Sequence, residues 1–373
     1  MNVAQLKFCA VVAIALCLPT TVLAQSQKQS AHASSLQSAA ATLAALPEAD
    51  TIIYASPQKI LNDAAPKVMS QADVAKMRAG FADIKKDLGF DPATIDLLAI
   101  AVRFQKPTTD LSFVPPDVLL VMSGDLSADS LITLAGVYLQ DRSRTETYGS
   151  KTLTLMKIDP IAEAAQKNPL LKSFVEIGVV ALNSNTLAVG TTDYLKAAVD
   201  AADGKARISS ATINSLLRDP NALVSAAGSP LTAFAKSFGL LGTQTTAREE
   251  KCDSRFGDFY GAITMDASNF NLRGAMNTDN PDTAKIINGL LSSLLQPAID
   301  SIPDKQAQTV LKAIRMLPRE NEIVWEADVP HQTVATLIQE QIAPKKTDTA
   351  SVSGTSAPAK TKPKTRRRVR RSK

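Results

Sequence analysis

The chain has 373 residues, of which 45% are hydrophobic and 21% are charged, and its formal net charge is +5. It contains only three cysteines and two histidines, too few for a disulfide framework or for a zinc site at ordinary ligand spacing. Stability must therefore come from a hydrophobic core, and the apolar content suffices for one large or two modest domains. Because phosphate-binding and dinucleotide-binding glycine motifs are also missing, the sequence predicts no cofactor and no metal.

Residues 1–24 are typical of a secretory signal peptide. An apolar run over residues 8–18 follows the single charge of Lys7, and the small or apolar residues 22–24 suit cleavage. The run is shorter than the ~20 apolar residues that span a bilayer. We therefore expect export to the periplasm, the cell envelope or the extracellular medium. Residues 25–45 are small and polar, which predicts a linker or a frayed helix.

Residues 46–205 form the first predicted module, in which strand patterns alternate with helical ones. Gly204 stands where the C-cap of the last helix belongs. We expect strands over 50–55, 96–104 and 117–125, helices over 56–69, 71–88 and 127–139, hairpins over 145–158 and 178–190, and a closing helix over 191–204.

Residues 206–343 repeat this order and form the second predicted module. We expect a strand over 221–228, a helix over 229–238, a hairpin over 259–277, a helix over 280–296, a strand over 321–329 and a helix over 330–342. Both halves match the order β-α-β-β-α-β. The predicted fold class is therefore α+β, with two ferredoxin-like modules that each have an antiparallel sheet. The alternative is one continuous α+β domain with a large mixed sheet.

Residues 344–373 differ from the rest of the chain. They carry a net charge of +10, almost no large apolar residue, and many Ser, Thr, Pro and Ala residues, which predicts a disordered tail. The body from Gln25 to Pro344 then has a net charge of −6. Such a polycation attracts polyanions without reading a sequence. The predicted polyanion-binding residues are Lys360, Lys362, Lys364, Arg366, Arg367, Arg368, Arg370, Arg371 and Lys373.

Ser56 and Lys59 match the Ser-x-x-Lys pattern of penicillin-interacting serine enzymes. Lys59 would share a helix face with Ser56 and could take its proton. The companion Ser-Asp-Asn and Lys-Thr-Gly patterns of those enzymes are missing, however. Ser followed by Pro57 equally suits an N-cap and the first position of a helix. We predict that Ser56 begins a helix with its oxygen bound to the backbone. A capping residue followed by Pro recurs at Asp91-Pro92, Asp159-Pro160, Ser229-Pro230 and Asn280-Pro281.

Four other features have weaker implications. His331 is expected in the first turn of an exposed helix, and Cys252 in a charged loop as a free or intermolecular thiol. Residues 255–263, "RFGDFYGAI", resemble the aromatic strand of RNA-recognition motifs without keeping its full pattern, so we expect their aromatic side chains to pack in the core or at an edge. The apolar face of the helix over residues 283–298 predicts core burial, with a dimer or partner interface as the alternative.

The segments "YGSKTLTL" and "NTLAVGTTDYLKAAVDA" resemble parts of uncharacterised exported bacterial α+β proteins of an acidobacterial type. The resemblance implies export and an α+β body, and it implies no activity.

These observations give one leading hypothesis and two alternatives. The leading hypothesis is a non-catalytic envelope or secreted protein. Its acidic body would bind a protein or polymer, or a second copy of the chain. Its basic tail would tether it to lipid headgroups, lipopolysaccharide or an acidic wall polymer. The alternatives are a serine hydrolase that uses Ser56 and Lys59, and an exported nucleic-acid-binding protein without base-specific readout.

Overall fold

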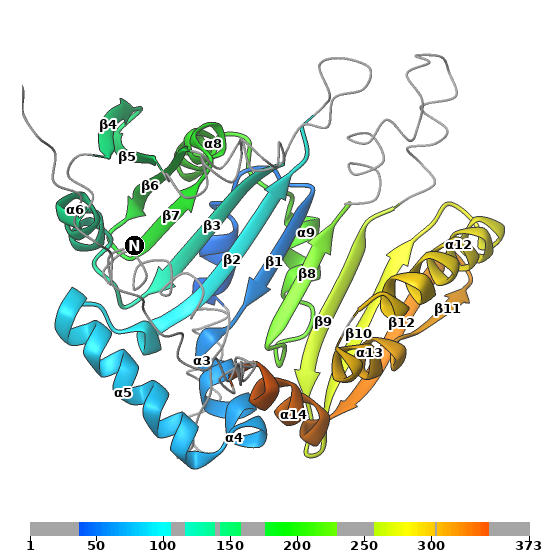
Figure 1. The fold of residues 1–373 in the computed structure, drawn as a ribbon. Helices are drawn as coiled ribbons and strands as arrows, with labels where there is room; N and C mark the ends of the chain where they lie inside the picture. Colours follow the sequence, from blue (N-terminus) through cyan, green and yellow to red (C-terminus); the bar gives the residue numbers. More distant parts are fainter. Residues whose placement is uncertain are drawn as a thin grey trace, which may run out of the picture.

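The structure is a computed structural model that describes residues 37–105, 116–138, 142–157, 176–229, 257–302 and 304–342. The fold is mixed α+β and is built on one large sheet with helices on both faces (Figure 1).

All the strands that the structure describes belong to one sheet of twelve strands, in the order β11-β12-β10-β9-β8-β1-β2-β3-β7-β6-β5-β4. Neighbouring strands in it are antiparallel. The first half of the chain supplies β1 (Thr51–Ala55), β2 (Ile95–Arg103), β3 (Asp117–Gly124), β4 (Ser143–Tyr148), β5 (Lys151–Lys157), β6 (Glu176–Asn183) and β7 (Thr186–Gly190). The second half supplies β8 (Val224–Gly228), β9 (Phe259–Met265), β10 (Asn269–Asn277), β11 (Arg315–Arg319) and β12 (Glu322–Pro330).

One face of the sheet, here called the α8 face after the helix α8 (Thr192–Ala202) that covers it, carries Ile52 and Tyr54 of β1. Successive strand residues point to opposite faces, so these two side chains share a core with Leu119 of β3. The cover on this face consists of a helix over residues 37–43, α8 (Thr192–Ala202) and α9 (Ser210–Leu216). The amphipathic helix α8 buries Leu195, Ala198 and Val199 there completely.

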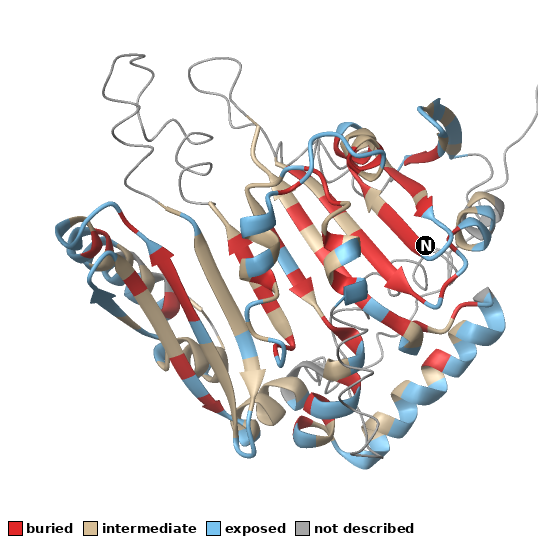
Figure 2. Cartoon of the chain, turned by 180° about the vertical axis from the view of Figure 1, so that it is seen from behind, coloured by how far each residue is buried: buried red, intermediate tan, exposed pale blue. Residues whose placement is uncertain are grey.

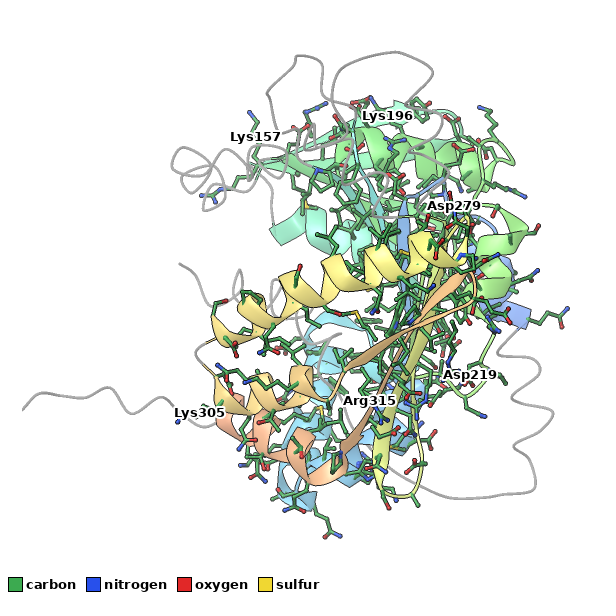
Figure 3. All side chains as sticks on the ribbon, turned by 90° about the vertical axis from the view of Figure 1, so that its right-hand side faces the viewer. Lys157, Lys196, Asp219, Asp279, Lys305 and Arg315 are labelled. Atoms are coloured by element: carbon green, nitrogen blue, oxygen red, sulfur yellow. The ribbon has the colours of Figure 1, made fainter. Side chains whose placement is uncertain are left out.

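The opposite face, here the α12 face, is covered by two groups of helices. At the first-half end lie α5 (Gln71–Leu88) and α6 (Ala128–Tyr138), which pack over β2, β3, β6 and β7. At the other end lie α12 (Pro281–Asp300), α13 (Lys305–Lys312) and α14 (His331–Ile342), all on the same side of the sheet (Figure 3). The short helices α3 (Pro57–Lys59) and α4 (Ala65–Val68), joined by the π-helical turn η1 (Ile60–Ala64), lead from β1 to α5.

Capping explains where the long helices begin and end. The Ser70 hydroxyl accepts the backbone N–H of Asp73 at the start of α5, and Gly89 ends that helix in the left-handed region at φ 67°. Asn280 likewise accepts the N–H of Thr283 at the start of α12, with Pro281 as the first helical residue. The prediction that a capping residue followed by Pro marks a helix start is confirmed at Asn280 and Asp91; Asp159-Pro160 and Pro230 lie outside the described residues.

The single sheet fits the predicted one-domain alternative better than two repeated modules with separate sheets, because β1 of the first half pairs with β8 of the second. The sheet is antiparallel where that alternative expected a mixed one. Three elements were not predicted: α9, α13 and β11. The sequence "RMLPR" of β11 does not indicate a strand, because Pro318 has no N–H to donate to a neighbouring strand. Proline is tolerated in a sheet mainly in an edge strand, which is the position of β11.

Candidate functional site

The polar residues at the carboxyl end of β1 form the first candidate site. β1 ends at Ala55, and the backbone N–H of Ser56 donates to the carbonyl of Leu223 at 2.9 Å before α3 begins at Pro57. The prediction that Ser56 begins a helix is therefore confirmed. Its predicted capping bond is wrong, since the Ser56 side chain makes no hydrogen bond to the backbone of the helix.

The hydroxyl of Ser56 instead bonds to the phenol of Tyr54. Both side chains are buried, with 7% of Ser56 and 6% of Tyr54 exposed. Burial raises the pKa of the Tyr54 phenol, which the hydrogen bond from Ser56 opposes. A serine so enclosed offers little surface to an incoming substrate.

Lys59 lies half-buried three residues beyond Ser56, and its amine donates to the carbonyl of Pro220. Desolvation lowers the pKa of Lys59, while the nearby carboxylates of Asp63 and Asp219 act in the opposite direction. A lowered pKa would suit a general base. The hydrogen bond that the structure gives this amine nevertheless goes to the loop before β8.

Asp96 completes this group and was not predicted from the sequence. Gln58 of α3 donates its side-chain amide to Oδ1 of Asp96 at 2.6 Å. Burial, and then the charge of Asp125, raise the pKa of Asp96. The pairing of β2 with β3 is irregular between Ile95 and Leu97. Since the alternation of the strand fails at this position, no sequence pattern could show where the Asp96 carboxylate points.

Three residues with displaced pKa values, Tyr54, Lys59 and Asp96, thus gather where β1 meets α3. Such gatherings mark functional sites more often than chance, but structural polar networks produce them too. Here Tyr54 pairs with Ser56, Lys59 with Pro220 and Asp96 with Gln58. The bonds of Gln58 and Lys59 connect α3 with β2 and with the loop before β8.

A second polar network lies near the other end of β2. The guanidinium of Arg103 contacts Asp117 at 2.8 Å and lies 4.6 Å from the ring centre of Tyr194. Asp117, only 3% exposed, also accepts the hydroxyl of Thr191 at 3.0 Å. The Tyr194 hydroxyl donates to the carbonyl of Glu48 at 2.9 Å. This network ties β2, β3 and α8 together.

The aromatic residues of β9 do not form a shared stacking platform. Phe259 lies on the α12 face, 6.2 Å from Trp325 between ring centres. Tyr260, its neighbour on the strand, points to the other face, where the guanidinium of Arg218 lies 4.1 Å from its ring centre. Base recognition by an aromatic strand needs rings on one face, so the expectation of packing roles holds for these two residues; Phe256 lies outside the described residues.

The apolar face of α12 is divided. Ile287 is 5% exposed and packs with Met276 and Ile323, whereas Ile286 is 72% and Leu290 is 52% exposed. The core prediction is therefore confirmed for Ile287, and an apolar edge remains on the described surface beside it. His331 is the first residue of α14, so its predicted place in the first turn of a helix is confirmed. The predicted exposure is wrong, because most of α14 is half-buried and the His331 ring lies 5.1 Å from that of Phe270.

The basic tail and Cys252 lie outside the described residues. Within the described part of the chain, no helix is long and apolar enough to cross a membrane. In those same residues no three His, Cys, Asp or Glu side chains gather in a group that could hold a metal ion.

Comparisons with known proteins give no family. Neither a protein-family model nor a curated protein matches the chain. Among solved structures, crystal forms III, IV and I of TP0453 are similar, with TM-scores of 0.40, 0.38 and 0.39 and 10% identity in each case. The alignments cover 80%, 79% and 80% of this chain and 97%, 95% and 96% of those chains. At these TM-scores, function must be argued from the residues of this chain.

Proposed function

We propose that this chain is an exported, non-catalytic binding protein that its C-terminal basic segment holds at an anionic surface. The division of charge carries the proposal: the body over residues 25–344 has a net charge of −6, and residues 345–373 have +10. Each Lys or Arg near an anionic membrane surface contributes about 1 kcal/mol of attraction. The segment therefore has enough charge to hold the body at lipid headgroups, lipopolysaccharide or an acidic wall polymer.

The attachment point of the basic segment suits a tether. The last described helix, α14, ends at Ile342 and packs against α4 and β12. Tension on the tail would therefore be carried by a helix that contacts one helix from the first half of the chain and one strand from the second half. The repulsion that a like-charged body would feel at an anionic surface also keeps the body itself in solution.

The geometry around Ser56 supports a non-catalytic function over the serine-hydrolase alternative. The serine is buried and bonded to Tyr54, and the Lys59 amine is bonded to Pro220. Covalent labelling of Ser56 by a fluorophosphonate or a β-lactam, lost in Ser56→Ala, would overturn this part of the proposal.

An internal repeat is a further part of the proposal, in a form that differs from two separate modules. From the central pair outward, the strand order is β1-β2-β3-β7-β6 in one direction and β8-β9-β10-β12-β11 in the other. In each half the fourth and fifth strands of this order form a hairpin, β6–β7 in the first half and β11–β12 in the second, and the later strand of each hairpin lies nearer the centre of the sheet. The first half has two additional strands, β5 and β4, at its outer end. This correspondence supports duplication of one unit whose two copies share a sheet.

The tether is tested by sedimentation of the full chain with vesicles of anionic phospholipid. The wild-type protein should sediment at low salt and be released at high salt, because surface charge attraction is screened. A full-length variant with the nine tail residues changed to Gln, and a chain that ends at Pro344, should stay in solution. Equal sedimentation of the wild type and the nine-Gln variant would refute the tether. Retention of the nine-Gln variant on immobilised nucleic acid would favour the nucleic-acid alternative.

A further inference from the structure

The two ends of the sheet differ in their suitability for pairing with another strand. β4 is the terminal strand at one end and β11 at the other. A terminal strand exposes backbone N–H and C=O groups, and proteins commonly protect it with Pro, charge or a bulge. β11 contains Pro318 between Arg315 and Arg319. β4, "SRTETY", contains no proline, and its Arg144, Thr145 and Thr147 are exposed.

The hydrogen bonds between β4 and β5 show which backbone groups of β4 point outward. The N–H of Lys157 donates to the carbonyl of Arg142 at 3.1 Å, and the register continues through Arg144 opposite Leu155. In an antiparallel pair, residues that exchange backbone bonds alternate with residues that do not. Arg144 and Glu146 therefore bond toward β5. The N–H and C=O groups of Ser143, Thr145 and Thr147 face away from it.

The charges of β4 favour one way of pairing two copies of this strand. A two-fold, antiparallel pair centred on Thr145 places Arg144 of each copy opposite Glu146 of the other, and Thr145 opposite Thr145. Opposite charges and Thr–Thr pairs directly across an antiparallel pair are favourable. Moving the centre to Arg144 or to Glu146 places like charges opposite each other. The charge pattern thus selects the register centred on Thr145, in which the outward-facing residues of the two copies bond to one another.

Contacts within the chain order the two charged side chains on the α8 face. Arg144 contacts Glu176 of β6 at 2.9 Å, and Lys196 of α8 contacts Glu146 at 2.6 Å. Arg144 also contacts Glu146 at 3.3 Å. Because Arg144 and Glu146 already lie extended side by side, less side-chain entropy is lost when a second copy adds the complementary pair.

We propose that the protein forms a two-fold dimer by antiparallel pairing of β4 with β4 of a second copy, centred on Thr145. The sheet then continues from one copy into the other, as in strand addition to an open edge, and the contact is isologous. The same arrangement of β11 would set Arg315 opposite Arg319 with Pro318 in the ladder, so the β11 edge is excluded. The dimer does not depend on the tether, because β4 and the basic tail are separate parts of the chain.

Sedimentation velocity of the full chain over a wide range of concentration tests the dimer. The wild type should show a monomer–dimer equilibrium. Arg144→Glu should raise the dissociation constant by about tenfold or more, because like charges then face each other. The exchange Arg144→Glu with Glu146→Arg should restore most of the affinity, since the pairs become complementary again. If the substitutions acted only by breaking the contacts of Arg144 with Glu176 and of Glu146 with Lys196 within one copy, the single variant and the exchanged variant would lose dimer affinity to the same extent.

Thr145→Pro separates strand pairing from other contacts. The N–H that this change removes faces away from β5, so the hairpin should remain while the dimer is lost; circular dichroism and thermal unfolding check that the fold is retained. Met316→Pro at the β11 edge is the matched control and should leave the dimer intact, because residues 316 and 318 alternate with those that bond toward β12, and the N–H of Met316 therefore faces away from that strand. A wild type that stays monomeric at every concentration, or a dimer that Thr145→Pro does not weaken, overturns the proposal.

Discussion

The two halves of the sheet are buried to different extents. The first half lies between two apolar layers, with one core beneath α8 and a second beneath α5 and α6. The second half has one small core beneath α12, around Met276 and Ile323. Figure 2, seen from the α8 face, shows more buried residues along the first-half strands than along β9. The same antiparallel sheet is thus the middle layer of three at one end and one of two layers at the other.

The polar face of the second half shows what replaces the missing layer. On the α8 face there, Arg273 of β10 contacts Asp328 of β12 at 2.5 Å, and Arg315 of β11 contacts Glu326 at 3.4 Å. Antiparallel sheets with one solvated face alternate apolar and polar residues, whereas strands covered on both faces are continuously apolar. The difference predicts that stability is concentrated in the first half.

Truncation of a buried leucine should show the largest difference between the halves. Leu119 of β3 is fully buried beneath α8, whereas Leu317 of β11 is 40% exposed. Leu119→Ala should lower the free energy of unfolding by about 2–5 kcal/mol, because it leaves a cavity. Leu317→Ala should lower it by less than about 1 kcal/mol. Urea unfolding of both variants measures the difference, and equal losses would contradict the comparison.

Removal of a carboxylate should also lower the stability more in the first half of the sheet than in the second, but by a smaller margin than removal of a leucine side chain. Asp117→Ala leaves Arg103 and Thr191 without their shared acceptor inside the protein, and should cost about 1.5–3 kcal/mol. Asp328→Ala breaks its contact with Arg273 on the solvated face, where both side chains are more than 40% exposed, and should cost less than about 1 kcal/mol. Thermal unfolding in low and high salt distinguishes the two, since only the exposed pair is screened.

The smallest effect on stability is expected from a substitution of Asp266, in the turn between β9 and β10. Asp266 accepts the backbone N–H groups of Ser268 and Asn269 and the side-chain amide of Asn271, and these bonds lower its pKa to about 2. A carboxyl group whose pKa is lowered by folding contributes stability above its unfolded pKa, near 4, and loses it as the pH falls toward 2. Asp266→Asn should flatten the acid side of the stability profile in that window. A carboxyl titration by NMR with a midpoint near 4 would contradict the assignment.

Much of the element order was predictable because its local signals agree with the final packing. The helix expected over residues 71–88 was found at Gln71–Leu88, where a serine N-cap and Gly89 bound the helix. Hairpins were found from their glycine and asparagine turns. The joining of the halves was not predictable, since the pairing of β1 with β8 depends on residues far apart in sequence. A period-two pattern identifies a strand and gives no information about its partner.

The site could be predicted only in part, for a related reason. Ser56 and Lys59 were found by their spacing, but the partners that decide their chemistry, Tyr54 and Pro220, come from a strand and from a distant loop. Asp96 gave no signal because the strand alternation fails beside it. The charge division between body and tail needed no structure at all.

The pairing of β1 with β8 at the centre of the sheet has a consequence for how the chain folds. Thr51 at the start of β1 lies opposite Gly228 at the end of β8, so the middle of the sheet closes only after more than half of the chain has been made. Contacts between residues distant in sequence slow folding, because the entropy of closing a long loop is lost before they form. β1 can pair with β2 as soon as both strands have been made, whereas the other edge of β1 stays unpaired until β8 has been made. A chain cut before β8 would expose that edge to strands of other chains, and aggregation would follow.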